Sequence, residues 1–124
     1  MKRYIDLLCI FAGAGIGGIS RHLLVYFINK PNAAFAFGTI SVNIIGCFVA
    51  GLFLFFIQQH EMSQPMALFF VTGLLGGFTT FSAFSMETVV YLQNGQVMTA
   101  VYNILLSLSG IIFAYAGYLL AKVL

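Results

Sequence analysis

Four long apolar segments constrain this chain more than any other feature of its sequence. They cover residues 4–28, 35–57, 66–92 and 97–123, and each exceeds the roughly 20 residues that a helix needs to cross about 30 Å of hydrocarbon. Charged residues make up only 6% of the chain, whereas about 25% is usual in a soluble domain. The sequence therefore predicts an all-α membrane protein, a single domain over residues 1–124 with four transmembrane helices.

Turn-forming and polar residues separate these segments. The breaks fall at residues 29–32, 58–65 and 93–96, and two of them contain a proline. A proline costs little in a loop, where its missing N–H is not needed by a helix. The apolar segments do not alternate as the strands of a membrane barrel would, so we expect helices joined by short loops.

The basic residues are divided almost evenly between the two ends of the predicted helices. Lys2, Arg3 and Lys122 would lie on one side of the membrane, and Arg21 and Lys30 on the other. Basic residues in short loops normally set the orientation of a membrane protein, and a difference of one residue is a weak bias. We therefore predict a dual-topology protein that pairs with a second copy of itself in antiparallel orientation.

Two pairs of glycines predict close helix packing. Gly13 and Gly17 form one pair, and Gly73 and Gly77 form the other. Small residues four positions apart give a flat face that another helix can approach closely.

The sequence offers no constellation typical of an enzyme. Cys9 and Cys47 lack the spacing of a metal or redox motif, and His60 beside Glu61 is most simply part of a solvated loop. The chain also shows no nucleophile–base pair and no paired carboxylates. We therefore expect no catalytic activity.

Several polar residues lie well inside the predicted helices, where such residues are functional candidates by default. For a serine or threonine, a hydrogen bond back to its own helix explains the position equally well, and Arg21 can extend toward the interface. Asn43 and Glu87 are harder to satisfy locally, so we expect each to bond to another helix or to face water. The full set is Arg21, Asn43, Thr79, Thr80, Ser82, Ser85, Glu87, Tyr102, Asn103, Ser107 and Ser109.

The stretch GGFTTFSAFS, residues 76–85, predicts a break in the third helix. Two glycines followed closely by two β-branched threonines weaken helix propensity. Carbonyl groups freed at membrane depth must be satisfied by other helices, water or an ion. Broken helices in transporters commonly mark ion sites near the middle of the membrane.

Three motifs together resemble the Fluc/CrcB family of fluoride channels. GTISVNIIGCFVAG at residues 38–51 resembles the second-helix signature of that family, and TGLLGGFTTFSAFSMET at residues 72–88 resembles its third-helix signature. GGISRH at residues 17–22 resembles its first-helix region around an arginine. The resemblance follows the whole chain in order, and two of the motifs are long and unusual.

The resemblance implies a fluoride-selective channel that exports fluoride passively across the cytoplasmic (inner) membrane and confers fluoride resistance. Members of the family are multi-pass, four-helix subunits that form antiparallel, dual-topology dimers in the lipid bilayer, with two pores and no nucleic-acid partner. By motif position, the backbone carbonyls of Gly76 and Thr79 would hold a structural Na⁺ at the dimer centre, and Arg21 would have a vestibule or structural role. The pore residues would be Asn43, Thr80, Phe81, Ser82, Phe84, Glu87 and Ser107.

Two positions depart from the family pattern. Ala83 stands where the motif usually has threonine, so one hydroxyl of its polar track is missing, and Cys47 stands where serine is common. The less distinctive fourth helix leaves open whether Tyr102 or Asn103 faces the pore beside Ser107. A paired heterodimer also stays open beside the homodimer.

The alternative function is that of a small multidrug-type exporter, which is also a four-helix and often dual-topology protein. Exporters of that class resemble proton-coupled antiporters with a carboxylate in the middle of the first helix. Here Asp6 lies at the end of that helix, and no acidic residue follows before Glu61. A structural membrane subunit is the third interpretation, but it would not explain the polar residues at depth.

Overall fold

The computed structural model describes residues 1–31, 33 and 35–124 of the chain. Within these ranges the chain forms no strand, and four helices are long and apolar enough to cross a membrane. The prediction of an all-α membrane protein with four membrane-spanning helices is therefore confirmed. Asn32, the last residue of the predicted loop 29–32, lies outside the described residues.

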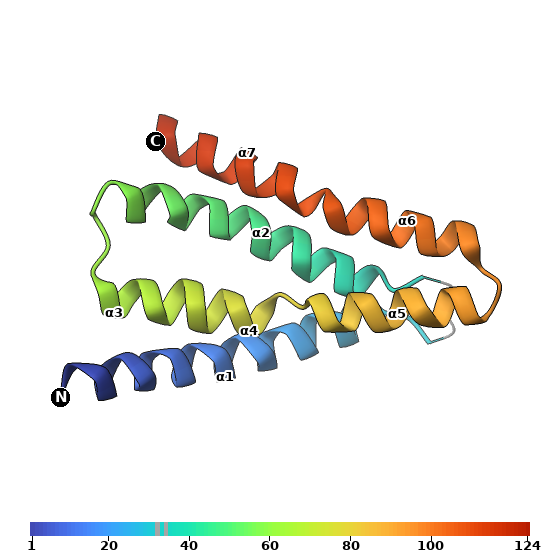
Figure 1. The fold of residues 1–124 in the computed structure, drawn as a ribbon, viewed down its shortest axis with the longest axis horizontal. Helices are drawn as coiled ribbons and strands as arrows, with labels where there is room; N and C mark the ends of the chain where they lie inside the picture. Colours follow the sequence, from blue (N-terminus) through green and yellow to red (C-terminus); the bar gives the residue numbers. More distant parts are fainter. Residues whose placement is uncertain (32, 34) are drawn as a thin grey trace.

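The four spans lie side by side, and both ends of the chain are at the same end of the bundle (Figure 1). The first two spans are the helices α1 (Lys2–Ile28) and α2 (Phe37–Gln58). The third consists of α3 (Gln64–Ala67), the π-helix η1 (Leu68–Leu75), α4 (Gly76–Phe78) and α5 (Phe81–Gln93). The fourth consists of α6 (Val97–Leu108) and α7 (Gly110–Val123).

The third span is broken where the sequence predicts it. Thr79 and Thr80 separate α4 from α5, and both have extended backbone, with ψ angles of 156° and 115°. The fourth span has an interruption at Ser109, which the sequence pattern does not predict. There the Ser109 hydroxyl donates to the carbonyl of Leu106 at 2.5 Å, a local bond that commonly bends helices.

The predicted glycine faces bring α1 against the first half of the third span. A Cβ built on Gly13 or Gly17 would collide with main-chain oxygens of η1, and one built on Gly73 or Gly77 would come within 2.8 Å of main-chain oxygens of α1. The two backbones touch because none of these positions carries a side chain. The expectation of close packing at both glycine pairs is confirmed.

A second glycine contact joins α2 to α7. A Cβ on Gly51 would collide with the carbonyl of Ala114, and a Cβ on Gly117 would collide with that of Phe48. Figure 1 shows these two helices running alongside each other. The bundle therefore consists of two tightly joined layers, α1 with η1 and α2 with α7. In the third span, α4 continues η1 up to the break and α5 continues the span beyond it.

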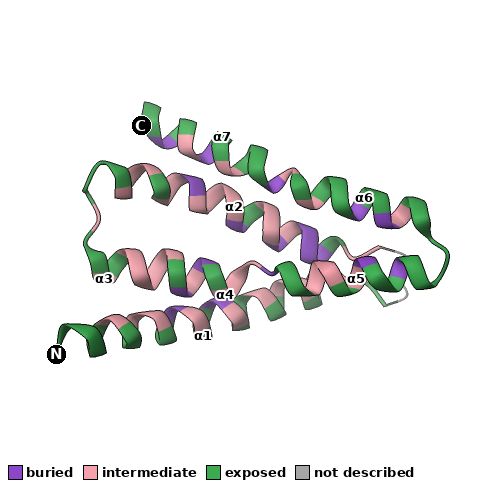
Figure 2. Cartoon of the chain, in the orientation of Figure 1, coloured by how far each residue is buried: buried purple, intermediate pink, exposed green. Residues whose placement is uncertain are grey.

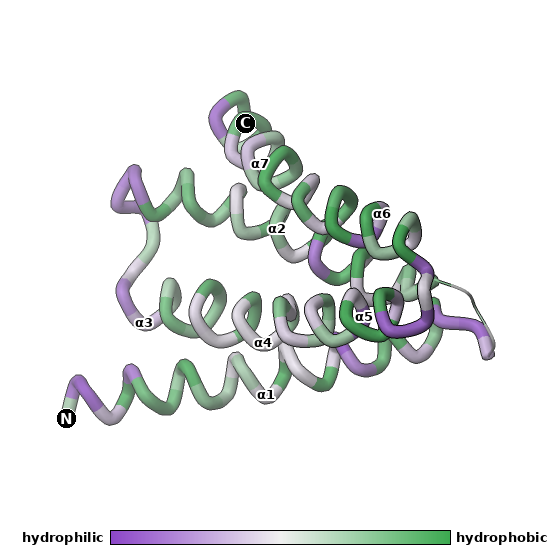
Figure 3. Tube along the Cα trace, turned by 45° about the vertical axis from the view of Figure 1, so that its right-hand side comes forward, coloured by the Kyte–Doolittle hydropathy of each residue, from purple (hydrophilic) through white to green (hydrophobic). Residues whose placement is uncertain are grey.

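The outer surface of the bundle is suited to lipid. Buried positions follow the lines where helices meet, and most of the outward-facing helix surface is exposed (Figure 2). That surface is hydrophobic along the spans and hydrophilic at the loops (Figure 3). Apolar helix faces without a partner in the same chain are stable when hydrocarbon covers them.

Candidate functional site

The break in the third span is held open by the side chain of Asn43 from α2. Its Oδ1 accepts the backbone N–H of Thr80 at 2.7 Å, and its Nδ2 donates to the carbonyl of Thr80 at 3.0 Å. One amide thus satisfies both main-chain groups of an extended residue that is only 8% exposed. Of the alternatives considered for Asn43, the structure shows a bond to another helix.

Because the Thr80 N–H bonds to Asn43, the carbonyl of Gly76 lacks the donor that it would have in a continuous helix. In a continuous α-helix the N–H of residue 80 would donate to the carbonyl of residue 76, but here the Thr80 N–H donates to Asn43. Gly76 itself is exposed, and the nearest atom that a Cβ there would meet is the carbonyl oxygen of Val71, at 3.8 Å. The break therefore presents a main-chain oxygen that has lost its helical donor.

Arg21 bonds to the break from the α1 side. Its Nη1 donates to the carbonyl of Thr79 at 3.1 Å, and the residue is half-buried. The guanidinium therefore has a partner inside the bundle rather than extending to the membrane surface. Arg21 of α1 thus bonds to the main chain of Thr79, and Asn43 of α2 bonds to the main chain of Thr80.

Two of the four candidate hydroxyls of the third span, those of Thr79 and Ser85, bond back to their own helix. Thr79 donates to Leu75 at 2.9 Å, and Ser85 donates to Phe81 at 2.9 Å. Thr80 differs because its hydroxyl caps the new helix, accepting the N–H of Ala83 at 3.2 Å. The Thr80 hydroxyl also lies 3.3 Å from the hydroxyl of the exposed Ser82.

A groove of about 350 Å³ opens beside the break, and we call it the break groove. Two phenylalanines of α5 line it, with ring centroids 5.4 Å apart and planes tilted by 59°; Phe81 is 79% exposed. The hydroxyl oxygen of Ser107 on α6 is buried and has no hydrogen-bond partner among the described residues. The lining residues are Asn43, Cys47, Thr79, Thr80, Phe81, Phe84, Ser107, Leu108, Gly110 and Ile111.

A second pocket, of about 260 Å³, lies on another side of Thr80 and contains Arg21, Thr39, Ala83 and Glu87. Glu87 accepts a hydrogen bond from the hydroxyl of Thr39 at 2.5 Å. Thr39 is only 2% exposed, and it was not among the polar residues predicted to be functional. Its position four residues before Asn43 on α2 was the available signal, because residues at that spacing share a helix face.

The predicted site residues thus fall into two groups that share Thr80. The break groove brings Asn43, Phe81, Phe84 and Ser107 together, whereas Arg21 and Glu87 line the second pocket. Ser82 contacts Thr80 but lines neither pocket.

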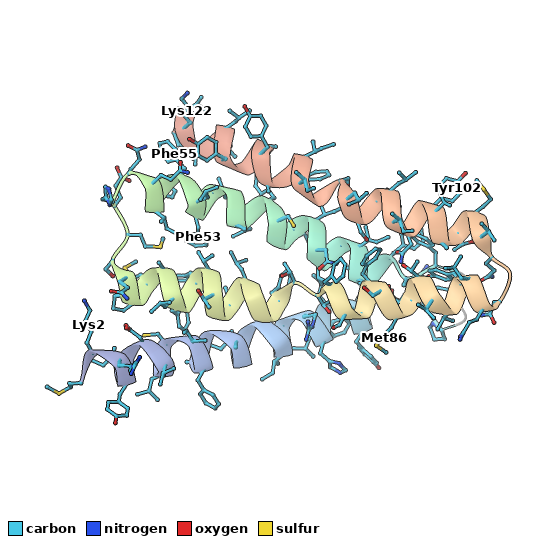
Figure 4. The ribbon with its side chains drawn as sticks, in the orientation of Figure 1. Lys2, Phe53, Phe55, Met86, Tyr102 and Lys122 are labelled. Carbon is cyan, nitrogen blue, oxygen red and sulfur yellow. The ribbon has the colours of Figure 1, made fainter. Side chains whose placement is uncertain are left out.

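The structure also distinguishes the two candidates on the fourth span. Tyr102 is 55% exposed and projects from the outer side of α6 (Figure 4). Asn103 is fully buried, and its Nδ2 donates to the hydroxyl of Thr88 at 2.9 Å. Asn103 is therefore the residue that lies inside the bundle, one helical turn before Ser107.

Comparison with known proteins assigns the chain to a family. A family described as "CrcB-like protein, Camphor Resistance (CrcB)" matches residues 8–118. A relative from Ruminiclostridium cellulolyticum named "Fluoride-specific ion channel FluC" is 38% identical over 130 aligned positions, covering 100% of this chain and 95% of the relative. Relatives with the same name from Pectobacterium atrosepticum and Flavobacterium psychrophilum are each 39% identical, covering 86% and 91% of this chain and 85% and 94% of their own lengths. The chain therefore belongs to the CrcB family.

Proposed function

We propose that this protein is a fluoride-selective channel that lets fluoride leave the cell passively across the cytoplasmic membrane. The observation that carries the proposal is that a relative named a fluoride-specific ion channel is 38% identical over the entire chain. The break groove supplies suitable chemistry for that function. Fluoride is small and strongly hydrated, so a selective path must replace its water with closely placed donors.

Neutral donors and ring edges are available in the break groove. Amides and hydroxyls donate hydrogen bonds, and both groups line the groove in Asn43, Thr80 and Ser107. An aromatic ring is electropositive at its edge, so Phe81 and Phe84 can face an anion edge-on. Polar donors beside ring edges therefore suit an anion that gives up part of its hydration.

Fluoride efflux from liposomes that contain only this protein tests the proposed function. We expect rapid efflux when a potassium ionophore balances the charge, without any proton gradient. Chloride-loaded liposomes are the selectivity control, and they should release little anion. Efflux no faster than that of protein-free liposomes would contradict a self-sufficient channel, and a strict requirement for a proton gradient would favour the exporter.

The functional unit that we propose is an antiparallel dimer of dual-topology subunits. A single chain leaves one side of the break groove open, with Phe81 79% exposed. Lys2 and Lys122 lie at the same end of the bundle (Figure 4), and Lys30 follows α1 at its other end, so the few basic residues outside the spans give only a small bias in orientation. A C-terminal tag labelled in intact and in opened cells should be found on both faces of the membrane. Labelling on one face only would contradict dual topology.

A Na⁺ ion at the dimer centre is the cofactor that we propose. Unwound backbone carbonyls coordinate Na⁺ in other membrane proteins, and Gly76 offers a carbonyl whose helical donor has been lost to Asn43. The Thr79 carbonyl accepts one bond from Arg21 at 3.1 Å and keeps a second lone pair. These oxygens fit the ion, and bound Na⁺ would supply positive charge that holds the two breaks together.

Removal of sodium is therefore expected to destabilise the dimer. A ligand present at a hundredfold excess over its Kd stabilises the bound state by about 2.7 kcal/mol. Exchange of Na⁺ for N-methyl-D-glucamine should lower the thermal midpoint of dimer dissociation by several degrees, and returning Na⁺ should restore it. An identical midpoint in both salts would exclude the proposed ion.

Loss of both groove phenylalanines should slow fluoride efflux. The pair Phe81→Ile and Phe84→Ile keeps apolar bulk but removes the ring edges. Because aromatic interactions contribute about 0.5–1.5 kcal/mol each, loss of both should slow efflux by about fivefold to a hundredfold. Phe53→Ile is the matched control, because Phe53 stacks on Phe70 of η1 at 5.3 Å and lies outside the break groove. Equal rates in the double variant and the wild type would show that the rings have no role.

A further inference from the structure

A third pocket, of about 520 Å³, lies at the end of the bundle opposite the two chain termini (Figure 1). We call it the α1-end pocket, because the last turns of α1 and the residues that follow form it. Its lining includes His22, Tyr26, Phe27, Asn29 and Lys30. His22 also lines the second pocket, whereas the other four residues line neither that pocket nor the break groove. A fluoride path through the break groove therefore does not account for this site.

The α1-end pocket lies at the depth of the lipid headgroups. α1 has 27 residues, so at 1.5 Å a residue it is about 40 Å long, which exceeds the roughly 30 Å of hydrocarbon. Its last turn therefore reaches the polar layer of the bilayer. Tyr26 is 70% exposed there, and its ring contacts that of Phe27 edge to face, with centroids 5.6 Å apart. A tyrosine at a helix end is typical of the membrane–water interface.

An apolar stripe on α1 leads from this pocket toward the middle of the membrane. Ile19, Leu23 and Phe27 are spaced four residues apart, so they share one face of the helix. Their side chains are 65%, 49% and 77% exposed. Exposed apolar patches of this kind mark contacts with lipid or with another protein. The stripe therefore offers a lipid acyl chain a continuous apolar surface that begins at the pocket.

The charge of the α1-end pocket is positive. Lys30 is exposed in the loop that follows α1, and no acidic residue lies between Asp6 and Glu61 in the sequence. Asp6 and Glu61 lie at the other end of the bundle, near the start of α1 and in the loop between α2 and α3. The third acidic residue, Glu87, lines the second pocket, where it accepts the hydroxyl of Thr39. Lys30 therefore gives this end of the bundle a positive charge that suits an anionic ligand.

Neutral hydrogen-bond donors share the pocket with Lys30. The Oδ1 of Asn29 accepts the backbone N–H of Gly38 at 2.8 Å, which leaves the NH₂ group of that amide to donate. The Tyr26 hydroxyl and the His22 ring can donate as well. A lysine ammonium binds phosphate as a point charge, and the neutral donors suit the phosphate oxygens. The pocket therefore matches a phosphate group both in charge and in hydrogen bonding.

We propose that the α1-end pocket binds the phosphate group of an anionic phospholipid, with one acyl chain along the apolar stripe of α1. Lys30 supplies the positive charge, and the neutral donors hold the phosphate oxygens. The depth of the pocket and the stripe beside it favour a lipid over a free phosphate ion. Lipid binding here does not depend on fluoride conduction, because it requires only that the chain spans a bilayer. In the proposed antiparallel dimer, each leaflet would hold one such lipid.

Native mass spectrometry of the whole protein tests this lipid site. Protein in detergent with added phosphatidylglycerol should retain one lipid per chain, and it should bind phosphatidylcholine with the same acyl chains more weakly. Lys30→Gln should bind phosphatidylglycerol about fivefold more weakly, the effect expected for one basic residue near an anionic lipid surface. Lys2→Gln is the matched control and should bind as the wild type, because Lys2 begins the same helix at the opposite end of the bundle (Figure 4).

Three results would overturn the lipid site. The first is equal affinity for phosphatidylglycerol in Lys30→Gln and the wild type. The second is displacement of the lipid by inorganic phosphate, which lacks acyl chains and would then be the ligand. The third is a dimer that retains no phosphatidylglycerol, because a second copy of the chain would then cover the stripe on α1. Retention of one lipid per chain by protein that shows no fluoride efflux would support the lipid site and contradict the channel, so the two proposals can fail separately.

Discussion

Replacement of Asn43 by leucine is expected to abolish measurable fluoride efflux. Both polar ends of this amide bond to the main chain of Thr80, at 2.7 and 3.0 Å. Leucine has a similar size but cannot form either bond, and each buried group left unsatisfied costs about 1–3 kcal/mol. The break would lose its extended geometry, and the groove would lose a donor. The two groups together cost about 2–6 kcal/mol, so we expect efflux at least about thirtyfold slower, since about 1.4 kcal/mol corresponds to tenfold in rate.

Two further variants separate the role of Asn43 from general damage to the groove. Cys47→Ser changes another residue of the break groove that has no bond to the break, so we expect efflux close to that of the wild type. Asn43→Asp keeps the acceptor for the Thr80 N–H but loses the donor to its carbonyl, so a folded but poorly conducting protein is expected. Efflux from Asn43→Leu within about twofold of the wild type would refute this account of the break.

The position of the break could be predicted because its cause is local. Two glycines and two β-branched threonines weaken the helix within a few residues, and the structure has extended backbone at Thr79 and Thr80. The partners of the break could not be predicted in the same way. The bond from Asn43 joins residues 37 positions apart, and the pattern within one helix does not determine which face of another helix meets it.

The sequence likewise does not predict that the polar residues are divided between two pockets. Thr80 and Glu87 are seven residues apart, so an unbroken helix would align them along one face. The extended backbone at Thr80 changes that relation, because α5 begins only at Phe81. Glu87 instead bonds to Thr39 of α2. Helical periodicity therefore predicts neighbours within α5, but it does not extend across the break.

The fourth span shows how similar local sequences can have different consequences. Most of its length follows from the need to cross the membrane, so the span itself was predictable. Its interruption at Ser109 coincides with a bond from the Ser109 hydroxyl back to the carbonyl of Leu106 at 2.5 Å. Ser107 lies only two residues earlier, yet its hydroxyl has no partner among the described residues. Which serine bonds back to its own helix depends on its packing, and the sequence alone does not show that packing.

The substitution Gly17→Leu is expected to disrupt the folded bundle itself. A Cβ at Gly17 would collide with the main-chain carbonyl of Leu74, and it would also come within 2.9 Å of the backbone nitrogen of Phe78. These are main-chain atoms, which cannot move aside as the end of a flexible side chain can. Overpacking of a close contact costs about 1–3 kcal/mol or more, so we expect the thermal midpoint to fall by at least about 5 °C.

The damage from Gly17→Leu should also reach the break. Phe78 is the last residue of α4, and Arg21, one turn after Gly17 on α1, bonds to the next carbonyl at Thr79. Gly15→Leu is the matched control on the same helix, because a Cβ at Gly15 would meet nothing within 4 Å. We expect folded dimer and efflux to survive in Gly15→Leu and to be lost in Gly17→Leu. Equal thermal midpoints for the two variants would mean that close approach of α1 to the third span does not hold the break in place.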